Sequence, residues 1–393
     1  MTGWPYTRRD TSPPALRRPV TMLSALAVFI ALGGSAVGQS AKEPAVPTSG
    51  RSGVSCVTNR LASLGGGHGN ATAVSRTGIA VGITDDARLQ SHPVMWRDGR
   101  VTRIRTKLVG AVPVAVNKHG VVVGTGFDRR SQLPVGWYWD GRVRLLPTDQ
   151  GDTAFPSAID DAGRVVGAVA SDEDHADGNV VDDVERAVYW PSVRSLPRLL
   201  GPLAGDEGAH AFAIRGKKIG GVSAGDTFTP VVWDLAGRPT ALRSHGGGAV
   251  HAFTNSGRPA GEAVLGGVGL RAVIWDRAGR PRQLAGVGVG SESTVTGAAA
   301  DLLTGTRRER SAGPGGRQTA MVWRGKQKFT LQPLQTLRPG RGPALRGVGA
   351  VGAAASVTAK GTAIVGYSMA VHDGEDPYLV VAADKGTATF SDT

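Results

Sequence analysis

Cysteine is nearly absent from this sequence. Cys56 is the single cysteine among 393 residues, so no disulfide can form within one chain and stability must come from packing. Aromatic residues make up only 5% of the chain. Neither the H-E-x-x-H motif of zinc proteases nor the S-x-D-x-G-x-T-W box of sialidase propellers occurs. The sequence therefore offers no motif for a disulfide-rich fold, a zincin or a sialidase.

Long apolar runs are also scarce, and the longest lies near the N-terminus. Four arginines within residues 1–18 precede an uncharged stretch whose apolar centre is Met22 to Leu32. These eleven residues are short against the roughly 20 needed to cross a bilayer. We therefore predict a secretion signal over 1–38, cleaved after small residues, and an extracellular mature protein with no stable membrane span. A retained anchor is the alternative.

Glycine, by contrast, is abundant, with 58 residues, and it marks an internal repeat. The pattern G-x-x-apolar-G recurs, as in GVVVG at residues 120–124 and GRVVG at residues 163–167. Its closing glycines are Gly82, Gly124, Gly167, Gly220, Gly261, Gly305 and Gly366. A second marker is the tryptophan that closes an apolar run: Trp96, Trp139, Trp190, Trp233, Trp275 and Trp323. Both markers indicate seven units of about 43 residues, and Tyr378–Val381 replaces the tryptophan in the seventh.

Each unit contains four short apolar segments separated by Gly, Asn or Asp, which is typical of a propeller blade. We predict an all-β, seven-bladed β-propeller over residues 54–393, preceded by a flexible linker at 39–53; six or eight blades remain alternatives. The valines of the G-x-x-apolar-G segment would pack between blades, and the tryptophan would be a buried plate. Residues 57–64 or 387–390 would supply the strand that closes the ring.

The order Ala-apolar-Asn-x-x-Gly, x-Val-Val-Gly, apolar-apolar-Trp over residues 57 to about 385 resembles the HAF-repeat family of secreted bacterial proteins. His210-Ala211-Phe212 and His251-Ala252-Phe253 spell its tripeptide, although before the glycine-led segment instead of before the tryptophan. The resemblance implies export and a propeller-like fold, and it implies no established activity. From their place in the repeat, we expect His210 and His251 at equivalent positions near the axis, more often structural than catalytic.

The connections from second to third strand vary in length, so we expect the binding face there. The most distinctive is the acidic segment 171–185. The candidate ligand-binding residues come from this segment and from the corresponding loop of unit seven. They are Asp172, Asp174, His175, Asp177, Asp182, Asp183, His372 and Asp373. Carboxylates clustered before a glycine suit calcium, for which Asp172, Asp174 and Asp177 are candidate ligands. Calcium is the one cofactor suggested, and a solvated acidic insertion is the alternative.

The net charge of +13 is carried by arginines that recur after turns, as a solvated rim would place them. No nucleic-acid recognition motif accompanies this charge, so specific nucleic-acid binding is not expected. We predict a monomeric secreted binding or scaffold protein that recognises an extracellular polysaccharide or protein through its variable loop face. The alternative is a secreted hydrolase or lyase that acts on glycans with acidic residues of segment 172–185. Small first-strand residues such as Ala115 and Ala158 favour binding over catalysis.

Overall fold

The computed structural model describes residues 61–149, 152–171, 185–266, 269–286, 288, 290–299, 302–309, 318–330, 348–351 and 367–370. These ranges contain strands and turns, and no helix within them is long and apolar enough to cross a membrane. The secretion signal, the linker and Cys56 lie outside the described residues.

Six four-stranded antiparallel sheets follow one another along the chain, each with its strands in sequence order. The first comprises β1 (Gly65–Val74), β2 (Ala80–Asp86), β3 (Ser91–Arg97) and β4 (Arg100–Arg103). The second comprises β5 (Val109–Val116), β6 (Val122–Phe127), β7 (Pro134–Trp139) and β8 (Val143–Leu145). The third comprises β9 (Asp152–Ile159), β10 (Val165–Ser171), β11 (Arg186–Trp190) and β12 (Arg198–Leu199).

The fourth sheet comprises β13 (Gly208–Arg215), β14 (Lys218–Ala224), β15 (Phe228–Asp234) and β16 (Pro239–Ala241). The fifth comprises β17 (Gly248–Phe253), β18 (Pro259–Val264), β19 (Leu270–Trp275) and β20 (Pro281–Gln283). The sixth comprises β21 (Ser291–Ala299), β22 (Leu302–Glu309), β23 (Gln318–Arg324) and β24 (Gln327–Thr330). The sixth unit lacks the usual glycine-led segment, yet it forms a complete sheet.

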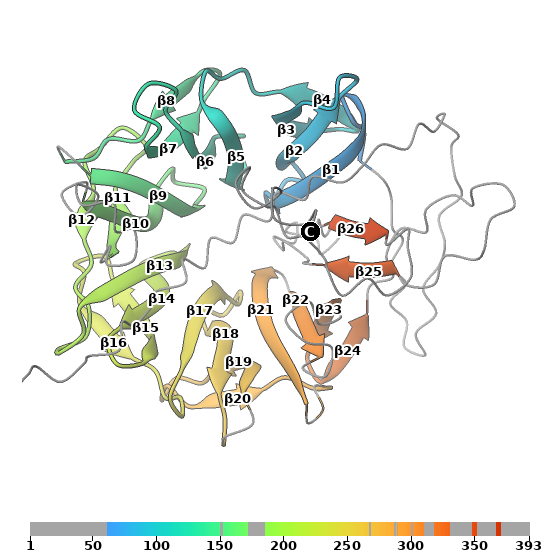
Figure 1. Cartoon of the computed structure of the whole chain (residues 1–393). Coiled ribbons are helices and arrows are strands. Elements are labelled where there is room, and N and C mark those ends of the chain that lie inside the picture. Colours follow the sequence, from blue (N-terminus) through green and yellow to red (C-terminus); the bar gives the residue numbers. More distant parts are fainter. Residues whose placement is uncertain are drawn as a thin grey trace, which may run out of the picture.

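The sheets are arranged around a central axis as the blades of a β-propeller (Figure 1). The first strand of each blade is innermost, and the fourth lies at the periphery. A two-stranded sheet, β25 (Val348–Val351) with β26 (Tyr367–Ala370), lies between the sixth and first blades, where it contacts β23 and β1. The all-β propeller is therefore confirmed with six four-stranded blades in the described part of the chain. Most of the seventh predicted unit lies outside that part.

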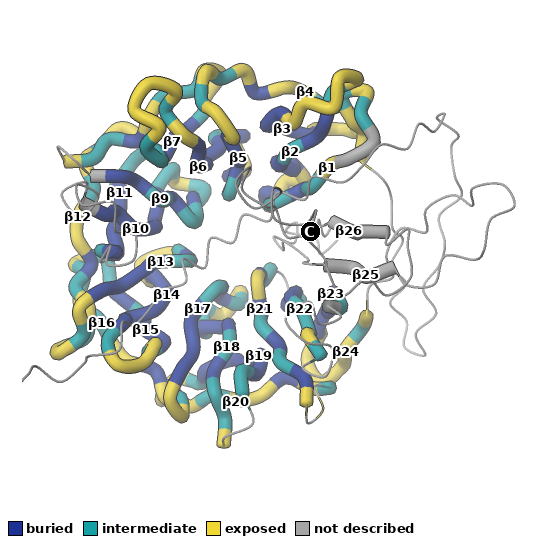
Figure 2. Tube along the Cα trace, in the orientation of Figure 1, coloured by how far each residue is buried: buried dark blue, intermediate teal, exposed yellow. Residues whose placement is uncertain are grey.

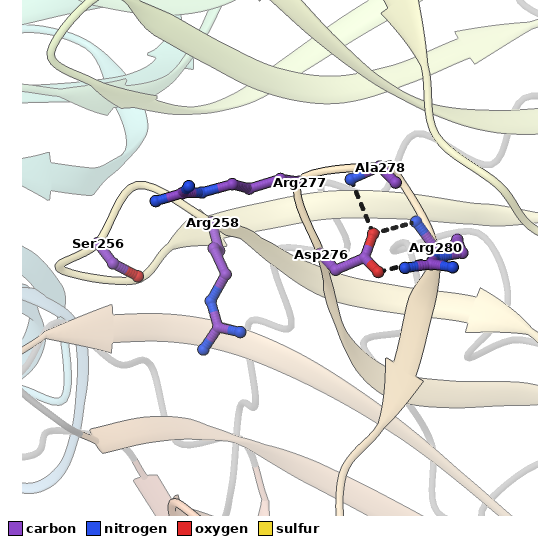
Figure 3. A pocket seen from close by; sticks show the side chains of 6 residues that line it. All are labelled: Ser256, Arg258, Asp276, Arg277, Ala278 and Arg280. Carbon is purple, nitrogen blue, oxygen red and sulfur yellow. Dashed lines mark hydrogen bonds and ion pairs between the residues drawn. The ribbon is translucent and has the colours of Figure 1, made fainter.

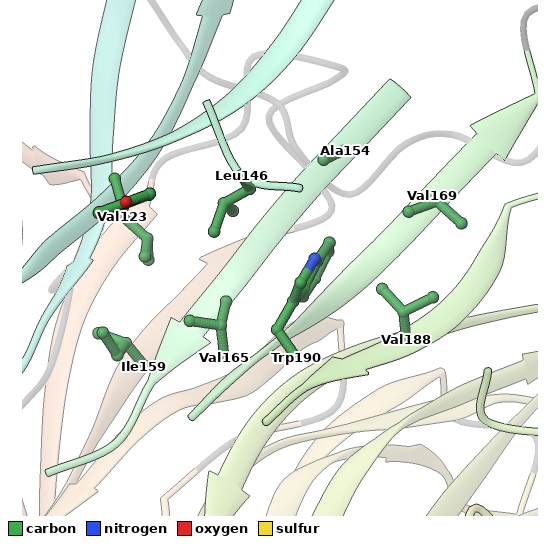
Figure 4. Packing of buried hydrophobic residues seen from close by; sticks show 9 residues of the cluster. Val123, Leu146, Ala154, Ile159, Val165, Val169, Val188 and Trp190 are labelled. Atoms are coloured by element: carbon green, nitrogen blue, oxygen red, sulfur yellow. The ribbon is translucent and has the colours of Figure 1, made fainter. Parts of the chain in front are cut away.

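Apolar side chains of consecutive blades pack against each other, as the repeat predicts. One core joins Val123 and Tyr138 of the second blade to Val165 and Trp190 of the third (Figure 4). Buried residues concentrate on the middle strands, and exposed residues on turns and outer strands (Figure 2). The tryptophan plates are confirmed by Trp190, Trp233, Trp275 and Trp323, each at most 1% exposed. For the second blade the prediction is wrong, because Trp139 is only half-buried and Trp137 is the fully buried ring. Burial of such large rings is what holds one sheet against the next.

Each first strand contains a β-bulge directly after the residue that faces the closing glycine. The bulge brings a carbonyl oxygen of the first strand close to the closing glycine. For example, a Cβ added at Gly261 would lie only 2.0 Å from the backbone oxygen of Ala249. The closing glycine therefore lies within the second strand. Glycine is required there by the close approach of the first strand, and not by a turn. In the fourth blade the equivalent residue is Gly221 instead of Gly220, because Gly221 faces Ala211. Gly120 has the expected positive φ, 82°, in the first hairpin.

Candidate functional site

The bulges place one extra residue of every blade beside the axis. These bulge residues are Thr72, Val114, Ser157, Phe212, His251 and Thr296. Each is half-buried or exposed, although the strand residue before it is buried. These residues belong to the innermost strands, which surround the central axis (Figure 1). Two of them reach the next blade: Thr72 Oγ1 donates to Pro113 O at 2.6 Å, and Ser157 Oγ is 2.8 Å from His210 Nε2. We call the surface formed by these six residues the axial wall.

Chemically reactive side chains gather on the axial wall of the third, fourth and fifth blades. The ring of Phe212 stacks on His210 with centroids 4.5 Å apart and an angle of 18° between planes. The same ring lies 5.0 Å from the ring of His251 in the next blade. His251 Nε2 is 3.6 Å from the Glu262 carboxylate, and each of these two side chains is 22% exposed. A phenyl ring thus lies between two imidazoles, one of them beside a carboxylate.

His210 is held by groups of the third blade. Its Nδ1 is 2.7 Å from Glu185 Oε2, and its Nε2 is 2.8 Å from Ser157 Oγ. Glu185 directly precedes β11, and its backbone oxygen also accepts a hydrogen bond from Ala209 N at 2.8 Å. Glu185 therefore fixes both the backbone and the imidazole of the fourth blade's inner strand. His210 is only 5% exposed and Glu185 only 9%, so this pair is shielded from water.

The two histidines are not equivalent, contrary to the prediction from the repeat. His251 is the bulge residue of its blade, whereas Phe212 is the bulge residue of the fourth blade and His210 lies two positions earlier. The tripeptide spelling starts at a different register in the two units. This offset brings His210 against Ser157 and leaves His251 on the axial wall.

The G-x-S-x-G pattern at Gly221–Gly225 does not form a nucleophile elbow. Ser223 lies within β14 and is fully buried. Its hydroxyl donates to Asp206 Oδ2 at 2.6 Å and accepts from Leu203 N at 2.9 Å. Both bonds fasten the segment before β13, so Ser223 is a structural residue.

The variable loop face carries a recess of about 230 Å³ between the first and second blades. Its lining includes Gln90 and Arg129 from the second-to-third-strand connections of these blades, together with Ser91, His92 and Arg103 from β3 and β4. His92 Nε2 is 2.8 Å from Asp86 Oδ2. This hydrogen bond is the main cause that lowers the pKa of Asp86 from 3.8 to about 2. The connections between second and third strands do vary, from Asp86–Ser91 to Ser171–Arg186.

The opposite face, with the uniform turns, has a more open recess of about 510 Å³ on the fifth blade (Figure 3). Arg258, Arg277 and Arg280 line it together with Asp276. Asp276 Oδ2 accepts from Arg280 Nε at 2.9 Å, and its pKa is lowered chiefly by the backbone N–H of Arg280. The turn arginines are therefore partly neutralised by aspartates of the same turn.

The binding and metal residues proposed from the sequence lie outside the described residues. They are Asp172, Asp174, His175, Asp177, Asp182, Asp183, His372 and Asp373. Of that acidic segment, the described residue Glu185 is buried and bonds to His210 behind the axial wall. Within the described ranges, no three His, Cys, Asp or Glu side chains are grouped so that they could hold a metal ion.

The sequence reasoning overlooked Ser157, Phe212 and Glu262. A usable signal existed, because the bulge residue stands six positions before the turn glycine in four blades. These pairs are Thr72 with Gly78, Val114 with Gly120, Ser157 with Gly163, and His251 with Gly257.

The C-terminal residues 353–393 match the sequence family of the bacterial NAD-glutamate dehydrogenase catalytic domain. No curated protein matches the chain. Among solved structures, a puromycin-hydrolysing peptidase of Mycobacterium tuberculosis is similar over 65% of this chain and 43% of its own, with 15% identity and a TM-score of 0.43. The chain thus spans less than half of that peptidase.

Two further solved structures are similar over more of their own length. A putative TolB of Agrobacterium tumefaciens is 11% identical over 59% of this chain and 83% of its own, with a TM-score of 0.42. The β-propeller domain of the Trilobed protease of Pyrococcus furiosus is 12% identical over 68% and 82%, with a TM-score of 0.45. At these values the similarity assigns no activity to the present chain.

Proposed function

We propose that this protein is a secreted β-propeller that binds an extracellular polysaccharide through the axial wall of its third, fourth and fifth blades. The observation that carries the proposal is the half-buried ring of Phe212, which lies between the imidazoles of His210 and His251. A partly exposed aromatic ring beside polar groups is suited to a ligand with both apolar and hydrogen-bonding surfaces.

A sugar ring has that combination of surfaces. Its C–H face packs on an aromatic ring, while its hydroxyls bond to carboxylates and imidazoles. Glu262 and His251 are each 22% exposed next to Phe212, so both can exchange water for sugar hydroxyls. A protein partner that inserts an aromatic or aliphatic side chain is the alternative ligand, and it would not be competed by free oligosaccharide.

The proposal is tested by screening the mature chain on a glycan array and measuring the affinity of a retained oligosaccharide by calorimetry. Phe212→Ala and His251→Ala should each weaken binding about tenfold, which corresponds to about 1.4 kcal/mol. Thr296→Ala, at the exposed bulge residue of the sixth blade, is the matched control and should bind as the wild type does. Equal affinity in all variants would show that the ligand binds elsewhere.

We also infer that the ring holds seven blades, with β25 and β26 belonging to the seventh. The tryptophan indoles support this. Four of them donate to a carbonyl just after the preceding blade's fourth strand: Trp190 to Pro147, Trp233 to Gly201, Trp275 to Arg243 and Trp323 to Ala285. Trp96 of the first blade donates to Ala62. By this equivalence, the residues before Ala62 are the fourth strand of the last blade, which closes the ring.

The N-terminal apolar segment supports export, as its short length favours a cleaved signal over an anchor. Expression of the full chain in a bacterial host should yield a mature N-terminus near Gln39 in the extracellular fraction, readable by mass spectrometry. Recovery of the intact chain in membranes would support the retained anchor instead.

A further inference from the structure

The hydrogen bonds around His210 have a fixed direction. Ionised Glu185 can only accept, so its Oε2, 2.7 Å from His210 Nδ1, requires the proton to be on Nδ1. In the neutral imidazole, Nε2 then carries a lone pair. Ser157 Oγ, 2.8 Å away, must therefore donate its proton to Nε2. The Ser157 hydroxyl is thus aligned with a base, and the base is aligned by a buried carboxylate.

We propose that Ser157 is the nucleophile of an ester-hydrolysing site on the axial wall, with His210 as general base and Glu185 as positioning residue. The order carboxylate, imidazole, hydroxyl, with both separations under 3 Å, is the arrangement that activates a serine. Ser157 is the half-buried bulge residue of its blade and belongs to the axial wall, and its partner His210 stacks on Phe212 of the next blade. This inference does not depend on the ligand being a polysaccharide.

The reaction balances with water as the one co-reactant. Ser157 Oγ forms a bond to the ester carbonyl carbon while its proton passes to His210 Nε2. The C–O bond to the alcohol breaks, and the alcohol leaves with that proton. Water then gives a proton to His210 Nε2, and its oxygen bonds to the acyl carbon. The acid is released as Ser157 regains its proton. Glu185 stays ionised and stabilises the imidazolium in both steps.

The substrate class follows from the surroundings of Ser157. The bulge neighbours are Pro156 and Ala158, and the half-buried phenyl ring of Phe212 stands on the adjoining blade, so small apolar acyl groups suit the site. Carboxylic esters are the class assigned, because an ester carbonyl lacks the resonance stabilisation of an amide and an alkoxide leaves more easily than an amide anion. We expect acetyl and butyryl esters to be accepted in preference to long acyl chains.

The site is tested by labelling the full mature chain with a fluorophosphonate probe and mapping the modified peptide by mass spectrometry. Hydrolysis of p-nitrophenyl acetate gives the rate. The expected result is a label on Ser157 and a rate lowered at least ~10²-fold by Ser157→Ala and by His210→Gln. A folded wild-type chain with no label on Ser157, or an unchanged rate in folded Ser157→Ala, overturns the proposal. Circular dichroism confirms the fold of each variant.

The kinetic constants distinguish a positioning role of Glu185 from a purely structural one. Glu185→Gln should lower kcat ~10²-fold with little change in KM, and Glu185→Asp should restore part of it. The matched control is the double variant Ser157→Ala/Thr72→Ser. It removes the serine of the third blade and places a serine at the equivalent bulge of the first blade. That serine should remain unlabelled, and a label on it would show that bulge geometry alone, without His210, accounts for the reactivity. Since no glycan is used, failure here leaves the proposed binding function intact.

Discussion

The indole Nε1 of Trp96 donates a hydrogen bond of 2.6 Å to the carbonyl oxygen of Ala62. Trp96 is only 4% exposed, and the tryptophans of the third to sixth blades make the same bond to a carbonyl two residues beyond the preceding blade's fourth strand. Within the described residues, no blade precedes the first one along the chain. Under the proposed seven-bladed ring, the segment before Ala62 supplies the outer strand of the last blade and joins the two ends of the ring.

This closure predicts that residues 54–62 stabilise the whole propeller. A chain starting at residue 63 loses the acceptor of the Trp96 indole and leaves a buried N–H without a partner. Its free energy of unfolding should fall by at least about 2 kcal/mol relative to a chain starting at residue 54. Chemical denaturation of the two chains measures the difference. Equal midpoints and slopes would contradict closure by the N-terminal segment.

The closing glycines predict a second set of stability effects. A Cβ at Gly261 would lie 2.0 Å from the backbone oxygen of Ala249, so the two strands must separate in Gly261→Ala. We expect a loss of more than about 2 kcal/mol in thermal or chemical unfolding. Gly288→Ala is the matched control, because an added Cβ there meets no atom within 4 Å. If Gly261→Ala were as stable as the control, the bulge would not be present at that position.

The pair formed by Asp86 and His92 predicts an acid-dependent contribution to stability. Because the pKa of Asp86 is lowered from 3.8 to about 2 on folding, its stabilising effect is present above pH 3.8 and is lost as the pH falls through 2. Asp86→Asn should therefore be less stable than the wild type at pH 5, and the difference should vanish near pH 2. Unfolding midpoints measured from pH 5 to pH 2 test this. A difference independent of pH would mean that ionised Asp86 contributes nothing.

The repeat predicts most of the fold, because burial between sheets must recur with the blades. Trp190 and Trp275 lie where the period places them, and Gly120 has the positive φ that its hairpin needs. The candidate site was not predictable in the same way. The position of the bulge residue Ser157 can be read from its distance to Gly163, but its contact with His210 depends on how two neighbouring blades meet, which the repeat pattern does not record.

Ligand binding by the axial wall of the third, fourth and fifth blades can be tested on its histidines. The most direct measurement follows the imidazole signals of His251, His92 and His119 by nuclear magnetic resonance during titration with the retained oligosaccharide. If the ligand binds at the axial wall, the His251 signal shifts and saturates with the binding curve, while the signals of His92 and His119, on the first and second blades, stay in place. Saturated binding without a shift of His251 would contradict binding at the axial wall.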